Sequence, residues 1–178
     1  MRTGIVFTLT GPDRVGIVEE VTGVMLGLGG NVETSRMARL GGEFAILMLV
    51  SLPAARADGV DAAFEQLAAD GYLVSVTTAS RATAEAHRGW LRYQIEVHGA
   101  DHEGIIHEIA RGLSRQGINI ESADTGTTRA PVSGTPLFSM SALVAVPPDL
   151  SETEWTKELR EAGYQANVGI TVSAVDIG

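Results

Sequence analysis

The chain has 178 residues, of which 44% are hydrophobic and 20% are charged, so it can form a buried core and is not expected to be disordered. Its net charge is −9 at pH 7, from 22 acidic and 13 basic residues, and the arginines are scattered along the sequence. Direct binding of DNA or RNA, which needs basic clusters to neutralise phosphates, is therefore disfavoured. The sequence has no cysteine, which excludes disulfides, thiolate metal sites and a cysteine nucleophile.

No segment resembles a signal peptide or a membrane span. The first apolar stretch is interrupted by threonines and ends at residues 11–13, Gly-Pro-Asp. The longest apolar run, residues 44–50, is far shorter than the ~20 residues of a membrane helix. We therefore expect a soluble, cytoplasmic protein without a membrane partner.

The sequence contains an internal repeat. Residues 11–17 (Gly-Pro-Asp-Arg-Val-Gly-Ile) align with residues 99–105 (Gly-Ala-Asp-His-Glu-Gly-Ile) at an offset of 88 positions, and later matches require a longer turn around residues 129–135. The repeat predicts two modules, residues 1–80 and residues 89–178, with a small and polar linker at residues 81–88.

In the first half of the first module, the pattern predicts a strand, a helix and a hairpin. Alternating apolar residues predict a strand around residues 5–9, and apolar residues three and four apart predict a helix that ends at Gly29-Gly30. Gly41-Gly42 is a two-residue turn signal between strands at 32–40 and 43–52.

A second helix and a last strand complete the first module. Asp58 is the predicted N-cap of this helix, and Gly71 is its predicted end. The predicted buried stripe consists of Val60, Phe64 and Leu67.

The second module repeats this order of elements. Residues 91–97 alternate as a strand does, and Ile105, Ile109 and Leu113 form the stripe of a helix that ends at Gly117. A capping box at residues 151–154, Ser-Glu-Thr-Glu, predicts the start of the second helix, and Gly163 is its predicted end. A last strand follows at about residues 165–175.

The order strand-helix-strand-strand-helix-strand is that of the ferredoxin-like fold. We therefore predict an α+β protein of two tandem βαββαβ modules, each an antiparallel four-stranded sheet with two helices on one face. Exposed sheet edges and glycine-containing helices favour a homodimer, since an unpaired edge tends to be covered.

The turn from the first strand into the first helix of each module is the candidate ligand site. A helix N-terminus has unpaired N–H groups and a partial positive charge, so it can bind a carboxylate. Glycine permits close approach, aspartate can cap the helix or accept an ammonium group, and asparagine can offer an amide, which together suit an amino acid. The alternative is that aspartate and glycine are an ordinary cap and turn. The residues concerned are Asp13, Gly16 and Asn31, and Asp101, Gly104 and Asn119.

Three histidines, His98, His102 and His107, crowd one segment of the second module. His102 and His107 are five residues apart, or about 500° around a helix, so their rings diverge and do not form the zinc-protease motif. We expect solvated side chains and no metal; a metal-binding or enzymatic role of this segment is a third hypothesis. No nucleophile elbow, P-loop or dinucleotide fingerprint is present, so we expect no enzyme activity, no catalytic residue and no cofactor.

The string Asp13-Arg14-Val15-Gly16-Ile17, with Val21 and Gly29-Gly30-Asn31-Val32 after it, resembles the signature of ACT domains, small regulatory modules that bind amino acids. The second copy has His102 in place of the usual arginine and Glu103 in place of the usual proline or apolar residue. Residues 33–44 resemble more specifically the glycine-cleavage-system transcriptional repressor group, which consists of two ACT domains and little else.

This resemblance implies control through a protein partner, a DNA-binding activator, with glycine or a similar small amino acid as effector and glycine or one-carbon metabolism as the regulated process. It also implies that ligands lie at interfaces between two modules, held by the strand-to-helix turn of one and a strand of its neighbour. A second hypothesis is a protein–protein interaction module that binds no ligand. The residues carried over are Asp13, Arg14, Gly16, Ile17 and Asn31 for one site, and Asp101, His102, Gly104, Ile105 and Asn119 for the other.

Overall fold

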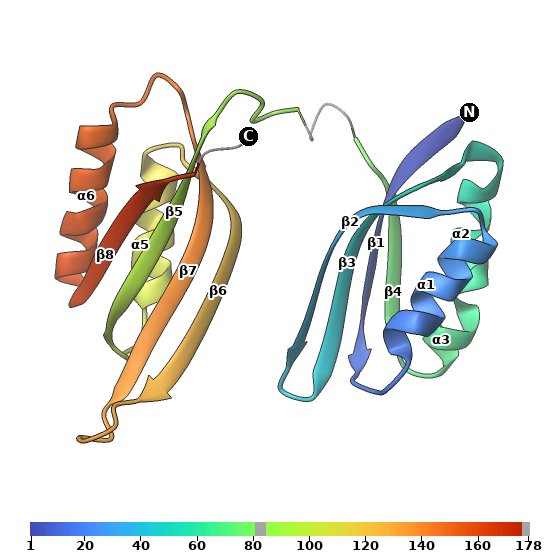
Figure 1. Cartoon of the computed structure of the whole chain (residues 1–178), viewed down its shortest axis with the longest axis horizontal. Coiled ribbons are helices and arrows are strands. Elements are labelled where there is room, and N and C mark those ends of the chain that lie inside the picture. Colours follow the sequence, from blue (N-terminus) through green and yellow to red (C-terminus); the bar gives the residue numbers. More distant parts are fainter. Residues whose placement is uncertain (81–84, 176–178) are drawn as a thin grey trace. The chain divides into compact units, whose positions relative to one another are not determined.

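The structure is a computed structural model that describes residues 1–80 and 85–175 of the chain. The chain divides into two compact units, Met1–Ala86 and His87–Gly178, which we call module 1 and module 2. Figure 1 shows that each module has its own sheet and its own helices. Residues 81–84 of the predicted linker lie outside the described residues.

Module 1 is a four-stranded antiparallel sheet with its helices on one face (Figure 1). The strands lie in the order β2-β3-β1-β4. They are β1 (Arg2–Pro12), β2 (Asn31–Leu40), β3 (Glu43–Pro53) and β4 (Leu73–Thr78). The helices are α1 (Ile17–Gly27), the 3₁₀ helix η1 (Ala54–Gly59), α2 (Val60–Ala63) and α3 (Glu65–Ala69).

Module 2 repeats this plan with the strand order β6-β7-β5-β8. Both sheets also have a register shift near the start of the second strand, between Val32 and Thr34 and between Ile120 and Ser122. The predicted pair of ferredoxin-like modules is therefore confirmed. The strands are β5 (Leu91–Ala100), β6 (Asn119–Arg129), β7 (Pro136–Val146) and β8 (Val168–Ala174), and the helices are α5 (Ile105–Arg115) and α6 (Glu152–Gln165).

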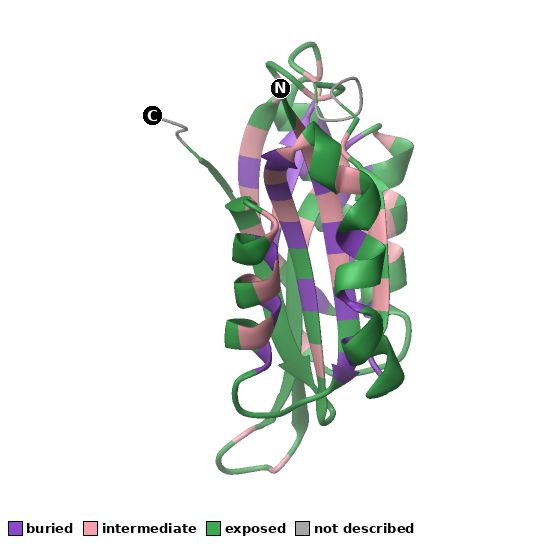
Figure 2. Ribbon diagram, turned by 90° about the vertical axis from the view of Figure 1, so that its right-hand side faces the viewer, coloured by how far each residue is buried: buried purple, intermediate pink, exposed green. Residues whose placement is uncertain are grey.

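Each module has its own core between the helices and the covered face of the sheet. In Figure 2, buried and more exposed residues alternate along the strands, as the pleat requires. An aromatic pair anchors each core: the ring centroids of Phe7 and Phe64 are 4.6 Å apart, and those of Tyr93 and Trp155 are 5.2 Å apart. The predicted stripe of module 1 is confirmed, since Val60, Phe64 and Leu67 are all buried.

Glycines in the left-handed conformation end the first helices and close the first hairpin. Gly29 (φ 73°) follows α1 and Gly117 (φ 71°) follows α5, which confirms both predicted helix ends. Gly41 and Gly42 have φ values of 61° and 95°, the signs that a type I′ turn needs, so this predicted hairpin is also confirmed.

The second helices differ from prediction. In module 1 the helix is broken into η1, α2 and α3. The break between α2 and α3 lies at Phe64, which departs from helical geometry (φ −106°, ψ 7°) and packs against Phe7. Asp58 lies within η1 and is not an N-cap; Gly59 holds that position.

In module 2, Ser151 does hold the N-cap position of α6, but its side chain makes no capping hydrogen bond, so the predicted capping box is wrong. The carboxylate of the next residue, Glu152, accepts a 2.8 Å bond from the Tyr93 hydroxyl. The pKa of Tyr93 is raised, mainly because the hydroxyl is partly buried and also because it is bonded to this carboxylate.

Gly163 does not end α6. It is buried within the helix, where an added Cβ would lie 2.6 Å from Cδ1 of Ile170. Glycine is needed there for close packing of α6 on β8, and the left-handed residue after the helix is Asn167 (φ 51°).

Within the described ranges, 1–80 and 85–175, no helix is long and apolar enough to cross a bilayer.

Candidate ligand-binding turns

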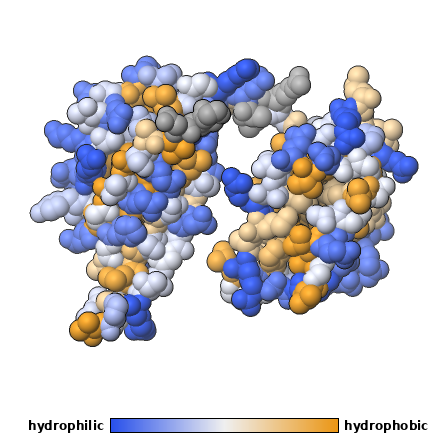
Figure 3. All heavy atoms as spheres, viewed as in Figure 1, coloured by the Kyte–Doolittle hydropathy of each residue, from blue (hydrophilic) through white to orange (hydrophobic). Residues whose placement is uncertain are grey.

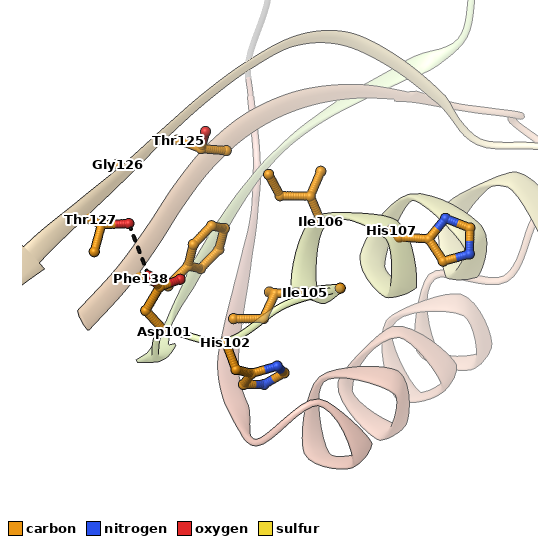
Figure 4. A pocket seen from close by; sticks show the side chains of 10 residues that line it. Asp101, His102, Ile105, Ile106, His107, Thr125, Gly126, Thr127 and Phe138 are labelled. Atoms are coloured by element: carbon orange, nitrogen blue, oxygen red, sulfur yellow. Dashed lines mark hydrogen bonds between the residues drawn. The ribbon is translucent and has the colours of Figure 1, made fainter. Parts of the chain in front are cut away.

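In module 2 the turn after β5 forms one wall of a hollow of about 550 Å³ (Figure 4). The turn and the first residues of α5 supply one side, and the ends of β6 and β7 supply the other. The lining residues are Asp101, His102, Gly104, Ile105, Ile106 and His107, together with Thr125, Gly126, Thr127 and Phe138.

Gly104 begins α5 in the left-handed conformation (φ 91°), and no side chain caps the helix. The N–H of Glu108 is bonded to the Gly104 carbonyl at 3.0 Å, so the amides before it belong to the first turn, whose N–H groups have no intrahelical acceptor. Ile105 is buried below them and fixes the first turn on the core. The turn therefore presents donors and a partial positive charge to the hollow.

Asp101 is not the cap of this helix, which corrects one of the two predicted roles. Its backbone N–H donates to the Pro136 carbonyl (2.9 Å), and its Oδ2 accepts a 3.3 Å bond from the Thr127 hydroxyl, drawn dashed in Figure 4. The carboxylate is held at the hollow by a neutral donor, so its negative charge is not neutralised by this contact.

His102 binds the protein backbone on both sides of its ring. Nδ1 is 2.9 Å from the Glu103 carbonyl oxygen, and Nε2 is 2.6 Å from that of Ala166, in the loop between α6 and β8. Two acceptors favour the doubly protonated ring, so the bond to Ala166 first, and then that to Glu103, raise the pKa of His102. In Figure 4 the ring lies on the side of α6, away from Thr125 and Thr127.

Module 1 has an equivalent hollow of about 580 Å³ at the turn after β1. Gly16 begins α1 with φ 89°, Ile17 is buried beneath the first turn, and no side chain caps the helix. The predicted cap by Asp13 is therefore also wrong. The lining residues are Asp13, Arg14, Gly16, Ile17, Val18, Glu19, Thr22 and Phe44.

The polar contacts of this turn differ from those of module 2. Asp13 Oδ2 accepts a 2.6 Å bond from Nε of Arg39, so the carboxylate is paired with a full positive charge. Arg14 forms an ion pair with Glu20, and its guanidinium lies 5.7 Å from the centre of the Tyr72 ring, just before β4. Arg14 and His102 thus both connect the turn to the segment that precedes the last strand.

Asn31 and Asn119 do not join the turn of their own module. Asn31 lies opposite Ser51 of β3, whereas Pro12, next to Asp13, lies opposite Glu43. Eight residues of strand separate these positions (51 − 43), which is about 26 Å at ~3.3 Å per residue. Asn119, opposite Ala145, is equally remote from the turn after β5. Either asparagine could meet a turn only if that turn belonged to another module.

The sequence interpretation missed the residues that the hairpin strands supply, chiefly Thr125, Thr127, Phe44 and Phe138. A usable signal existed, because Phe44 and Phe138 match in the repeat. The strand after an antiparallel hairpin returns along the first strand, so its first residues must lie beside the turn. Phe44 lies opposite Gly11, and Phe138 lies opposite Gly99.

The three histidines of the segment have separate surroundings. His98 lies on β5, His102 binds backbone carbonyls, and His107 lies on α5. Among the residues that the structure describes, no three histidine, cysteine, aspartate or glutamate side chains are grouped to hold a metal ion. The geometry gives no support to the metal-binding hypothesis.

Comparison with known proteins identifies the modules. ACT-domain family models match residues 3–76 and residues 93–151. The solved structure of an unknown protein from Galdieria sulphuraria is 34% identical, with 99% of this chain and 100% of that chain covered and a TM-score of 0.87. The structure of a candidate glycine cleavage system transcriptional repressor is 20% identical, with 99% of each chain covered and a TM-score of 0.71, and shares the fold. No match was found among curated proteins. Both halves of this sequence are ACT domains, and the chain belongs to the ACT-domain family.

Proposed function

We propose that this protein senses a small amino acid through the turns of its two ACT domains and passes the signal to a protein partner. ACT domains imply amino-acid-sensing regulation as the general class of function. The observation that carries the proposal for this chain is the position of Asp101, a carboxylate beside the uncapped first turn of α5 in an open hollow.

The chemistry of this arrangement suits a zwitterion. The carboxylate of an amino acid would accept hydrogen bonds from the amides at the start of α5, where the helix dipole favours negative charge. Its ammonium group would donate to Asp101 in a charge-assisted bond. The hollow of about 550 Å³ lies within the usual range for small-molecule sites, ~300–1,000 Å³, and leaves room for glycine or a similar amino acid.

The two turns differ in their suitability for an ammonium group. Asp13 is already paired with Arg39, whereas Asp101 accepts a bond only from the neutral Thr127 among its described side-chain contacts. Module 2 is therefore the stronger candidate site, although its His102 and Glu103 depart from the family pattern. His102 is engaged by backbone carbonyls and serves to position the turn.

The partner that we propose is a DNA-binding activator, and the regulated process is glycine or one-carbon metabolism. The net charge of −9 supports action through another protein and not through direct contact with DNA. The shared fold of the candidate glycine cleavage repressor supports this direction. We further propose a cytoplasmic, non-enzymatic protein that acts as a homodimer without a cofactor.

A module that binds partners without any ligand is the second candidate. It is favoured by two ion pairs of module 1, in which Asp13 is bound by Arg39 and Arg14 is bound to Glu20. These pairs already compensate the charges that a ligand would otherwise meet. In that case both turns would only fix the helices on the sheet.

A thermal-shift screen against the twenty amino acids tests the proposal, with Asp101→Asn and Asp13→Asn as matched variants that keep the side-chain shape. A ligand at 100 times its dissociation constant adds about 2.7 kcal/mol of stability, which corresponds to several degrees. We expect one small amino acid to raise the melting temperature of the wild type and of Asp13→Asn, but not that of Asp101→Asn. If no amino acid raises the melting temperature, the sensing function is wrong and the ligand-free module replaces it.

A further inference from the structure

The uncovered face of the module 1 sheet carries exposed leucines among small and polar residues. Helices cover one face of the β2-β3-β1-β4 sheet, and the side chains that alternate with the core residues form the other face. Leu40, Leu47 and Leu73 on this face have exposed fractions of 77%, 47% and 76%. We call this surface the open face of module 1. Its residues are Thr34, Arg36, Ala38 and Leu40 of β2, Glu43, Ala45, Leu47, Leu49 and Ser51 of β3, Arg2, Gly4, Val6, Thr8 and Thr10 of β1, and Leu73, Ser75 and Thr77 of β4.

Several of the same positions in module 2 carry polar and ionisable groups. Val6 and Thr8 of β1 correspond to Gln94 and Glu96 of β5, at the offset of 88. In module 2 these side chains form a surface network: Ser141 donates to Glu96 at 2.7 Å, and Gln94 donates to Glu96 at 3.1 Å. An antiparallel sheet with a solvated face normally has such polar residues outside. The fold therefore does not require apolar side chains at these positions, so their presence in module 1 needs a separate explanation.

Exposed leucines grouped on one sheet face mark contact surfaces in many proteins. Figure 3 shows apolar side chains gathered on the side of module 1 that carries β2 and β3. Three charged residues lie on the open face, Arg2, Arg36 and Glu43, and give it a net charge of +1.

We propose that two copies of this chain pair through the open face of module 1, sheet against sheet, in a symmetric dimer. The face carries a net charge of only +1 although the chain carries −9, so charge repulsion between two copies at this contact is small. Two such sheets can pack about 10 Å apart with their strands nearly aligned.

The size of the face is sufficient for this pairing. With strands ~4.8 Å apart and ~3.3 Å per residue, the three long strands and the short β4 give a flat area of roughly 600 Å² per copy. Two copies would bury about 1,200 Å² together, the lower end of the range for stable interfaces.

Sedimentation equilibrium of the full chain, over a range of protein concentrations, tests the pairing. The test variant Val6→Gln/Leu47→Ser replaces two residues of the open face with those that module 2 carries at the same positions, Gln94 and Ser141. The control Leu26→Ser replaces a leucine of α1 that is 74% exposed with the residue that module 2 carries there, Ser114. Circular dichroism confirms that each variant is folded.

We expect a wild-type dimer whose dissociation constant rises roughly 100-fold or more in the double variant, because each substitution occurs twice in a symmetric interface. The control should dimerise as the wild type does. If the double variant does not fold, Thr8→Glu, which matches Glu96, gives the same test with one substitution. A monomeric wild type, a dimer that survives the substitutions on the open face, or a dimer broken by Leu26→Ser alone would each overturn the proposal.

Discussion

In module 1 the aspartate after the first strand is paired with Arg39, and in module 2 the aspartate at the same place accepts a bond from Thr127. The two donors occupy the same position in the repeat, 26 residues after their aspartate. The ion pair with Arg39 neutralises the charge of Asp13, whereas the bond from the neutral Thr127 hydroxyl does not neutralise the charge of Asp101. The same backbone can therefore keep one turn as a structural element and the other as a candidate receptor.

The same contrast holds on the open faces of the two sheets. Module 2 has Gln94, Glu96 and Ser141 where module 1 has Val6, Thr8 and Leu47. What the modules share is the backbone plan: a left-handed glycine at the start of the first helix and another at its end. Our two proposals follow this difference: a polar ligand at module 2 and apolar contact at module 1.

The largest expected effect comes from the aromatic anchors of the two cores. Phe64→Ala and Trp155→Ala each remove a ring that is 1% exposed, and each should lower the free energy of unfolding by about 3–5 kcal/mol. Both tryptophans of the chain, Trp90 and Trp155, belong to module 2, so tryptophan fluorescence reports on that module. In a denaturant titration of Phe64→Ala, module 1 should unfold first. The circular dichroism signal should therefore begin to fall at a lower denaturant concentration than the tryptophan fluorescence changes. Coincident transitions for this variant would show that the cores do not unfold separately.

The next effect separates two glycines that match in the repeat. Gly71 has φ 94° and open space around its Cβ position, whereas Gly163 is packed against Ile170 and is helical. Asparagine tolerates the left-handed conformation, so Gly71→Asn should change the free energy of unfolding by less than about 1 kcal/mol. Gly163→Asn should reduce it by about 3 kcal/mol, because the new side chain overpacks the helix–strand contact and buries an amide. Equal effects in chemical denaturation would contradict this distinction.

Exchange of the aspartate partners should convert one turn into the other. Thr127→Arg gives Asp101 the ion pair that Asp13 has, and it should weaken amino-acid binding by about fivefold, as expected for an exposed ion pair. Arg39→Thr should leave binding at module 2 unchanged, and it should free the Asp13 carboxylate to accept an ammonium group. Isothermal titration calorimetry measures both. An unchanged affinity for Thr127→Arg would show that Asp101 does not contact the ligand.

The smallest effect concerns pH. The pKa of His102 is raised in the folded state by its two carbonyl acceptors, so the protonated ring stabilises the fold. This contribution is fully present below the unfolded pKa of about 6.5 and is lost as the pH rises through the higher folded value. Arg14, at the matching position, stays charged throughout. The melting temperature of His102→Gln should therefore fall below that of the wild type most clearly at acidic pH, and a constant difference across pH 5–9 would contradict this role.

The element order, the hairpin of module 1 and the ends of the first helices could be predicted because a local signal fixes each of them. Gly29, Gly41 and Gly117 all need positive φ, and no neighbour has to be known to infer that. The errors occurred where a distant contact decides. Gly163 was predicted as a helix end because it is a glycine, but the close approach of Ile170 explains it. Ser151 makes no capping bond, and the contact of its neighbour Glu152 with Tyr93, 59 residues away, could not be read from local sequence.

The candidate sites were predicted only in part for the same reason. The turn residues are adjacent in sequence, so the repeat identified them. Arg39 and Thr127 reach the turns through strand pairing and could not be found from spacing alone. Asn31 and Asn119 are only 18 residues after Asp13 and Asp101 in the sequence. The first helix of each module lies between them, so the asparagines are at the opposite end of the sheet from the turns.

The most direct test of the account is calorimetric titration of glycine, and of any amino acid found by thermal shift, into the wild type, Asp13→Asn and Asp101→Asn. We predict that binding to the wild type persists in Asp13→Asn and is lost in Asp101→Asn, with both variants folded as judged by circular dichroism. Equal binding by all three proteins would contradict the assignment of Asp101 as the ammonium acceptor, and absence of binding to the wild type would contradict amino-acid sensing itself.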